Sequence, residues 1–240
     1  MRLFSMLAAV LLLTAGPVLA QNSRTQAMEW LRMPTQGRTA YLTGAAAGAN
    51  AYAESQPGEH KLARVRIDMA VADMNSRLQD PLARQQSMMA LAWQVIQANQ
   101  DKGIPVLEAG GHVRDAQFDQ RLLFDYPWLY PVNLEAFVPM SQPKPTFAQT
   151  WLAAQNPLKL FFLEGFGDMV AERCLARFGD TPKGNACLKP LLPMPIDAVA
   201  TQMDAIYRDP RYAHTGYDLV ARAALLRMVG DDWQSVLNGK

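Results

Sequence analysis

Two segments of this sequence share residues in the same order, and this weak internal repeat narrows the range of possible folds. Trp30-Leu31 and Tyr41-Leu42-x-Gly44 recur as Trp151-Leu152 and Phe162-Leu163-x-Gly165, always at an offset of 121 residues (162 minus 41). Repeated segments are usually supersecondary units that bury their apolar faces against one another. The repeat therefore predicts two similar units within one chain.

A second stretch extends the repeat and indicates its secondary structure. IDMAVADMNSRLQDP (Ile67 to Pro81) aligns without gaps to IDAVATQMDAIYRDP (Ile196 to Pro210), at an offset of 129 residues (196 minus 67). Apolar residues fall three or four apart in both stretches, which is the period of a helix. The final Asp-Pro ends each helix because proline cannot continue one. Since alternating β-branched runs are nearly absent, we predict an all-α fold with two tandem units of about three helices each.

The start of the chain has the layout of a cleavable secretory signal. Met1-Arg2 supplies a positive charge, Leu3 to Leu13 an apolar run, and Val18-Leu19-Ala20 a small-residue exit. We expect cleavage near Ala20 and a soluble periplasmic protein, since no later segment is apolar for long enough to span a bilayer. Loss of Arg2 would leave 22 Lys plus Arg (23 minus 1) against 22 Asp plus Glu. This balance argues against nucleic acid as a partner.

The chain divides into four expected segments. They are a signal peptide (1–20), a first helical unit (21–103), a connector (104–150) and a second helical unit with a disulfide loop (151–240). Prolines spaced along the connector forbid a long helix there. Its aromatic residues are too many for a free linker. They either pack over a groove between the two units or, with Tyr126, Trp128 and Tyr130, form part of a binding face.

Cys174 and Cys187 are the only two cysteines of the sequence. In an exported protein we expect them to form a disulfide, although a metal-binding or catalytic thiol is the alternative. The bond would close a loop of 13 residues (187 minus 174) and stabilise the fold by about 3 kcal/mol. The eight extra residues of the second copy (129 minus 121) fall in this region. We therefore expect RFGDTPKGN to be a long loop that the crosslink restrains.

The stretch YLTGAAAGANAY, residues 41–52, aligns with the segment FLEGFGDMVAER of the second copy. Its alanines outweigh the helix cost of Gly44 and Gly48, which is about 1 kcal/mol each. We therefore predict a helix that packs closely against a neighbour, either the other half of the chain or a second copy in a homodimer.

The three histidines offer little organised chemistry. His60 and His214 fall at predicted loop positions, where solvated histidines are common. His112 has Glu108 and Asp115 nearby, and such a group could bind a metal or act in acid–base catalysis. Two glycines interrupt this segment, so the spacing does not describe a helix face. We expect no metal and no cofactor, and an enzyme using these three residues remains an alternative.

Glu164, Asp168 and Glu172 lie four residues apart, on one face of a predicted helix. Like charges at this spacing cost a few tenths of a kcal/mol for each contact. The stripe is either a solvated face that Arg173 and Arg177 neutralise, a cation site completed from elsewhere, or a docking face for a basic partner.

The second half resembles the periplasmic type VI amidase immunity (Tai-like) proteins. The resemblance covers Leu158 to Val229 and rests on Phe162-Leu163-Glu164-Gly165, Asp168, the two cysteines, a proline-rich entry from Pro190 to Pro195 and a helix closing at Asp-Pro. It implies a small, exported, helical protein with a disulfide. It also implies that the protein binds and blocks a peptidoglycan-degrading toxin.

The favoured function is therefore that of an exported, non-enzymatic binding protein, an inhibitor of a secreted cell-wall hydrolase. Two alternatives remain from the sequence. One is a structural or assembly protein of the envelope, and the other is an enzyme that uses His112.

Overall fold

The computed structural model describes residues 27–62, 65–100, 146–191 and 195–238, and almost all of its regular structure is helical. The elements are η1 (Ala27–Arg32), α2 (Thr35–Ser55), α3 (Ile67–Arg77), η2 (Ala83–Gln85), α4 (Met88–Ala98), α6 (Phe147–Ala153), α7 (Asn156–Phe178), α8 (Pro182–Leu188), η3 (Lys189–Leu191), α9 (Ile196–Tyr207), η4 (Pro210–Tyr212), α10 (Tyr217–Val229) and α11 (Gln234–Leu237). Within these ranges the β-structure amounts to an isolated bridge between Val65 and Gln100. The predicted all-α class is confirmed.

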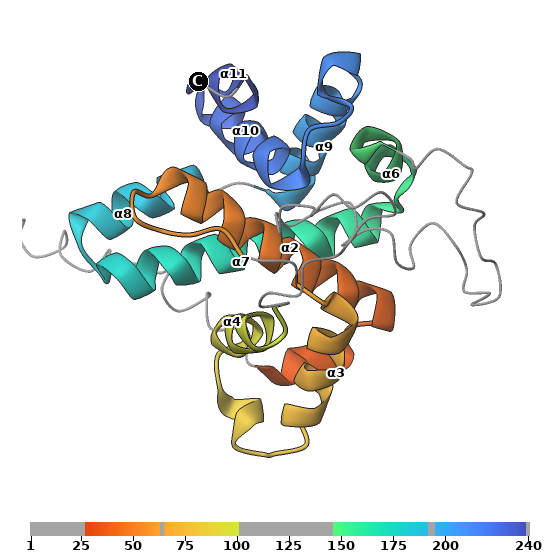
Figure 1. The fold of residues 1–240 in the computed structure, drawn as a ribbon, viewed down its shortest axis with the longest axis vertical. Coiled ribbons are helices and arrows are strands. Elements are labelled where there is room, and N and C mark those ends of the chain that lie inside the picture. Colours follow the sequence, from red (N-terminus) through yellow and green to blue (C-terminus); the bar gives the residue numbers. More distant parts are fainter. Residues whose placement is uncertain (1–26, 63–64, 101–145, 192–194, 239–240) are drawn as a thin grey trace, which may run out of the picture.

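The two longest helices, α2 and α7, lie side by side through the middle of the molecule (Figure 1). Helices α3 and α4 cover one side of this pair, while α9, α10 and α6 cover the opposite side. The helices of each half also contact the long helix of the other half, because α4 contacts α7 and α10 contacts α2. One continuous cluster of buried apolar side chains draws on both halves of the chain.

Helices α2 and α7 touch backbone to backbone at three glycines. A Cβ atom at Gly44 would overlap the carbonyl oxygen of Phe162, and one at Gly48 would overlap the carbonyl oxygen of Phe166. A Cβ at Gly165 would likewise overlap the carbonyl oxygen of Tyr41. From the Gly44–Phe162 contact to the Gly48–Phe166 contact the position advances by four residues on both helices, so α2 and α7 run in the same direction. The close packing predicted for residues 41–52 is confirmed, and the neighbour is α7.

The glycine contacts are reciprocal in the numbering of the repeat. Tyr41 and Gly44 correspond to Phe162 and Gly165, and each glycine meets the aromatic residue of the other segment. Gly44 meets Phe162, and their counterparts Gly165 and Tyr41 meet each other in the same way. Such an exchange of equivalent partners is what a two-fold axis between two similar units produces. This reciprocity supports the repeat, while the division of the chain into two units stays a prediction.

Helix α6 begins at Phe147, inside the range expected to belong to the connector. Thr146 starts it with a capping box, because its hydroxyl accepts from the Gln149 amide and the Gln149 side chain accepts from the Thr146 amide. These two bonds satisfy amides that the first turn of a helix leaves free.

The stretch expected to be a loop between the cysteines contains helix α8, so that expectation was wrong. Thr181 is its N-cap, with Oγ1 accepting from the Gly184 amide at 3.2 Å, and Pro182 stands at the first helical position. Both residues are typical of helix starts.

Among the described helices, none is long and apolar enough to cross a membrane.

Candidate functional site

Several residues predicted to have a function lie outside the described part of the chain. They are the aromatic residues Tyr126, Trp128 and Tyr130 and the group of Glu108, His112 and Asp115. His60 and His214 are described, and both lie exposed between helices, as the sequence predicted. The remaining candidate residues lie on α7 and on the elements around it.

The acidic stripe does lie on α7, but its central member faces the neighbouring helix. Tyr41 Oη of α2 donates a hydrogen bond to Asp168 Oδ2 at 2.8 Å. Glu164 and Glu172 are half-buried on the same helix. Asp168 thus belongs to the contact between α2 and α7.

Burial sets the protonation of this group of side chains. Loss of water around Asp168 raises its pKa from the usual 3.8 to about 7. The hydrogen bond from Tyr41 opposes this shift, whereas the charge of Glu164 adds to it. Burial also raises the pKa of Glu164 and raises the pKa of Tyr41 well above its ordinary range. Asp168 therefore changes charge near neutral pH.

Replacing Asp168 by asparagine is expected to stabilise the protein at pH 8 and to change little at pH 4. The folded state holds the Asp168 proton between pH 3.8 and about 7 while the unfolded state releases it, so the wild-type free energy of unfolding falls across this interval. Each pKa unit corresponds to about 1.4 kcal/mol, so the shift of about three units makes the variant more stable than the wild type by up to about 4 kcal/mol at pH 8. Urea unfolding at the two pH values measures it.

The control is Asp231→Asn, which removes an exposed carboxylate from the turn after α10. It should leave the free energy of unfolding nearly unchanged at both pH values. An Asp168→Asn variant that follows the pH dependence of the wild type would contradict the assignment of the shift to Asp168.

Arg173 and Arg177, which could have neutralised the acidic stripe of α7, form ion pairs with Glu59 instead. Arg173 Nη2 lies 3.2 Å from Glu59 Oε2, and Arg177 Nη1 lies 3.1 Å from Glu59 Oε1. Arg177 also donates to the carbonyl oxygen of Pro57 at 3.1 Å. Since Glu59 follows α2, both arginines join the end of α7 to the loop after α2.

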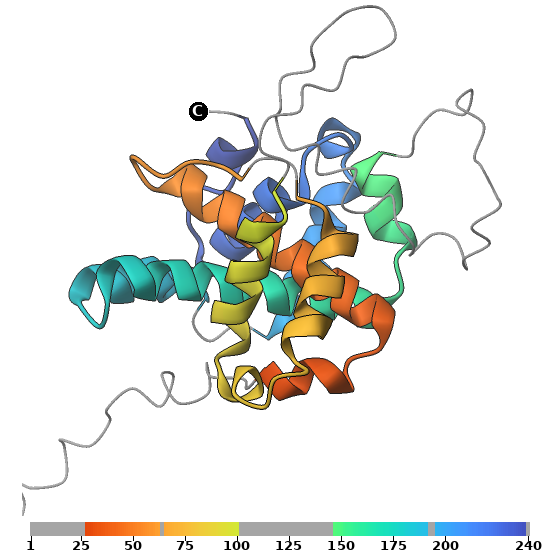
Figure 2. The same cartoon turned by 60° about the horizontal axis from the view of Figure 1, so that its bottom comes forward.

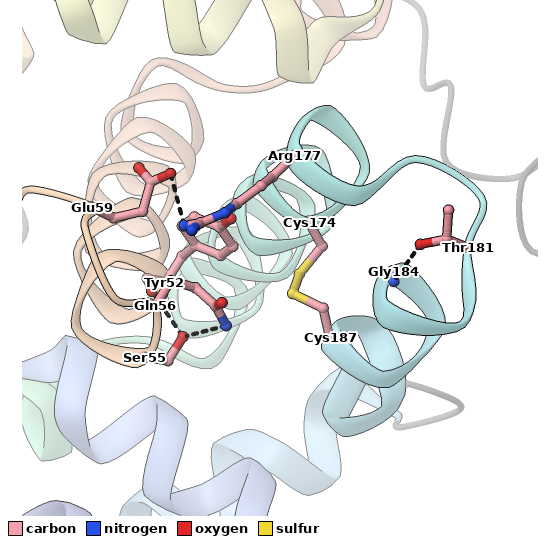
Figure 3. The surroundings of a disulfide bond; sticks show 9 residues. All are labelled: Tyr52, Ser55, Gln56, Glu59, Cys174, Arg177, Thr181, Gly184 and Cys187. Atoms are coloured by element: carbon pink, nitrogen blue, oxygen red, sulfur yellow. Dashed lines mark hydrogen bonds and ion pairs between the residues drawn. A yellow bond between two sulfur atoms is a disulfide. The ribbon is translucent and has the colours of Figure 1, made fainter.

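The end of α7 and helix α8 form a crosslinked hairpin, defined here as residues 174–188, which includes Arg177. Cys174 on α7 and Cys187 on α8 form the expected disulfide, with their Cα atoms 5.8 Å apart (Figure 3). Thr181 Oγ1 also donates to the carbonyl oxygen of Phe178 at 2.8 Å. Gly179 ends α7 at a φ of 58°, a conformation that favours glycine.

The tip of the hairpin closes tightly and points away from the core. A Cβ atom at Gly184 would overlap the carbonyl oxygen of Gly179. The start of α8 therefore packs against the end of α7 without space for a side chain. In Figure 1 and Figure 2 the C-terminal end of α7 and helix α8 extend beyond the helices around them. The exposed residues of the tip include Asp180, Lys183 and Asn185. The hairpin is therefore a stiff, exposed element.

Two equivalent polar clusters lie beneath the tryptophans of the repeat. Trp30 Nε1 donates to Asn75 Oδ1 at 2.7 Å, and Arg38 Nη1 donates to the same oxygen at 3.2 Å. In the other half, Trp151 Nε1 and Lys159 Nζ donate to Asp204 Oδ1 at 2.7 and 2.9 Å. The sequence analysis missed these clusters. Their signal was present, because all three positions correspond at the offsets of 121 and 129 residues.

In the described part of the chain, no three His, Cys, Asp or Glu side chains converge in a group that could hold a metal ion. Comparison of the chain with protein-family models, curated proteins and solved structures found no match.

Proposed function

We propose that this protein is exported and that it binds and inhibits a secreted cell-wall hydrolase through the crosslinked hairpin of residues 174–188. The observation that carries the proposal is the combination of stiffness and exposure in this hairpin. An element that is already ordered before binding loses little conformational entropy when it docks, so more of its contact energy appears as affinity.

The hairpin is anchored at its base as well as crosslinked within itself. The disulfide joins its two helices, and Arg177 fastens α7 to Glu59 and Pro57 in the loop after α2. Such anchoring transmits the rigidity of the core to the tip. This is the construction expected of an inhibitor that presents one fixed surface to an enzyme.

The exposed charges of α8 and the residues beside it indicate the kind of surface that this part of the protein fits. Lys183 and Lys189 are exposed on α8 and just after it, whereas Asp180 is the single exposed acid between Cys174 and Lys189. With two lysines and one aspartate, the segment of residues 180–189 has a net charge of +1, which is complementary to an acidic rim around a substrate cleft. We therefore place the contact on the hairpin and not on the stripe of Glu164, Asp168 and Glu172.

The proposal is tested with residues 21–240 and a panel of purified cell-wall amidases that release dye from labelled peptidoglycan. We expect the wild type to inhibit at least one of them. The double variant Lys183→Glu, Lys189→Glu should weaken inhibition by at least tenfold, because it reverses two charges at the contact. The matched control is Arg208→Glu, which reverses an exposed charge just after α9 and should inhibit like the wild type.

Removal of the disulfide provides a second test of the hairpin. In Cys174→Ser, Cys187→Ser the tip loses its crosslink, which should weaken inhibition while circular dichroism remains helical. Equal inhibition by all variants would move the contact away from the hairpin, and failure to inhibit any amidase would refute the proposed activity.

A further inference from the structure

A pocket of about 280 Å³ opens where α2, the loop after it, α4 and α7 meet. Its apolar wall consists of Ala49, Ala53 and Leu62. Its polar wall includes Arg173, Glu59, Lys61, His60, Gln97 and Gln100. A concave site that combines an apolar wall with converging polar groups is a usual form of a small-molecule site.

Arg173 is held in place on one side of this pocket. Its guanidinium lies 4.5 Å from the ring centre of Trp93 and 5.6 Å from the ring centre of Tyr52. One nitrogen, Nη2, donates to Glu59. Among the described residues the other N–H groups of Arg173 have no acceptor. Arg173 is therefore a fixed cation with unused hydrogen-bond donors.

The rest of the lining also supplies more donors than acceptors. Glu59 is the one carboxylate of the lining, and both Arg173 and Arg177 already bind it. Lys61 adds a second cation, which lies 3.4 Å from Glu54 at the surface. The Tyr52 hydroxyl, buried against the pocket wall, has no hydrogen-bond partner in the described part of the chain. Buried polar groups normally have a partner, so this hydroxyl keeps an unused donor and acceptor.

We propose that this pocket binds a small carboxylate that carries an apolar group. The carboxylate meets Arg173 and Lys61, and the apolar group lies against Leu62 and the two alanines of α2. The site lies apart from the exposed tip of the hairpin, which does not line it, although Glu59 both lines the pocket and anchors Arg177.

The probe is benzoate, and its neutral counterpart is benzamide, which has nearly the same shape. Benzoate titrated into residues 21–240 should shift the NMR signals of the Trp93 indole N–H and the Leu62 amide. A ligand of nine heavy atoms is expected to bind with a Kd of about 1 mM or below. Benzamide should bind at least tenfold more weakly, because it lacks the charge.

Two lysine variants make the test specific. Lys61→Gln removes a cation of the pocket and should weaken benzoate binding at least threefold. Lys183→Gln removes an exposed cation from α8, outside the pocket, and should leave the Kd unchanged. Equal affinities of benzoate and benzamide, equal effects of the two variants, or the absence of shifts at Trp93 and Leu62 up to 20 mM benzoate would each overturn the proposal.

Discussion

Replacing Gly44 by alanine is expected to destabilise the protein by about 3 kcal/mol or more. The added methyl group would overlap the carbonyl oxygen of Phe162, and the main chain of α7 cannot rotate away as a side chain could. The two helices would have to separate, which would loosen the buried side chains on both sides of them. Alanine is also the better helix former by about 1 kcal/mol, so a net loss of stability measures the clash. Urea unfolding gives the difference.

The matched control is Gly167→Ala in the neighbouring helix. A Cβ atom at Gly167 would meet nothing within 4 Å. The same exchange should therefore stabilise the protein by up to about 1 kcal/mol. Opposite signs at the two glycines would show that contact, and not helix propensity, decides the outcome. A neutral result at Gly44 would mean that α2 and α7 do not lie this close.

Replacing Asp204 by alanine is expected to cost about 3–5 kcal/mol, because it strands a buried charge. The Lys159 side chain is only 8% exposed, and its ammonium group lies 2.9 Å from Asp204 Oδ1. The Trp151 Nε1 donor would lose its acceptor in the same variant. Lys159 also lies 5.4 Å from the ring centre of Trp151, a contact that the substitution spares. Urea unfolding at neutral pH measures the loss.

Asn75→Ala is the corresponding change in the other half of the chain. Trp30 and Arg38 both donate to the Asn75 side chain, but Arg38 retains the carbonyl oxygens of Trp30 and Leu31 as acceptors. A loss of about 1–2 kcal/mol is expected there, because the neutral donor of Trp30 loses its acceptor while Arg38 keeps two others. If the two variants cost the same, the buried charge of Lys159 adds nothing to the stability of the cluster.

The all-α class, the helix over residues 41–52 and the disulfide could be predicted because each depends on local sequence. Periodicity identifies helices, and a shared offset identifies positions that do the same work. The same offset could have identified the pair of Arg38 and Lys159 beneath the tryptophans. Helix α8 was missed although Thr181 and Pro182 are ordinary start signals, since its glycine and proline content favoured a loop.

The partners of the charged residues could not be predicted in this way. Spacing along one helix places Asp168 on a face, but it does not say which helix covers that face. Tyr41, which binds Asp168, lies 127 residues away in the sequence. Glu59, which binds Arg173, lies 114 residues away. Such pairs follow from tertiary packing, which a single sequence does not contain in readable form.

The contact of Gly44 with Phe162 also has a consequence for the rate of folding. Its two sides are separated by 118 residues (162 minus 44), so a long loop must close before α2 finds its cover. Closing such a loop loses chain entropy before any contact compensates for it, and chains rich in distant contacts fold slowly. The Ala- and Gly-rich face of α2 therefore stays uncovered during synthesis until α7 in the second half of the chain has been translated.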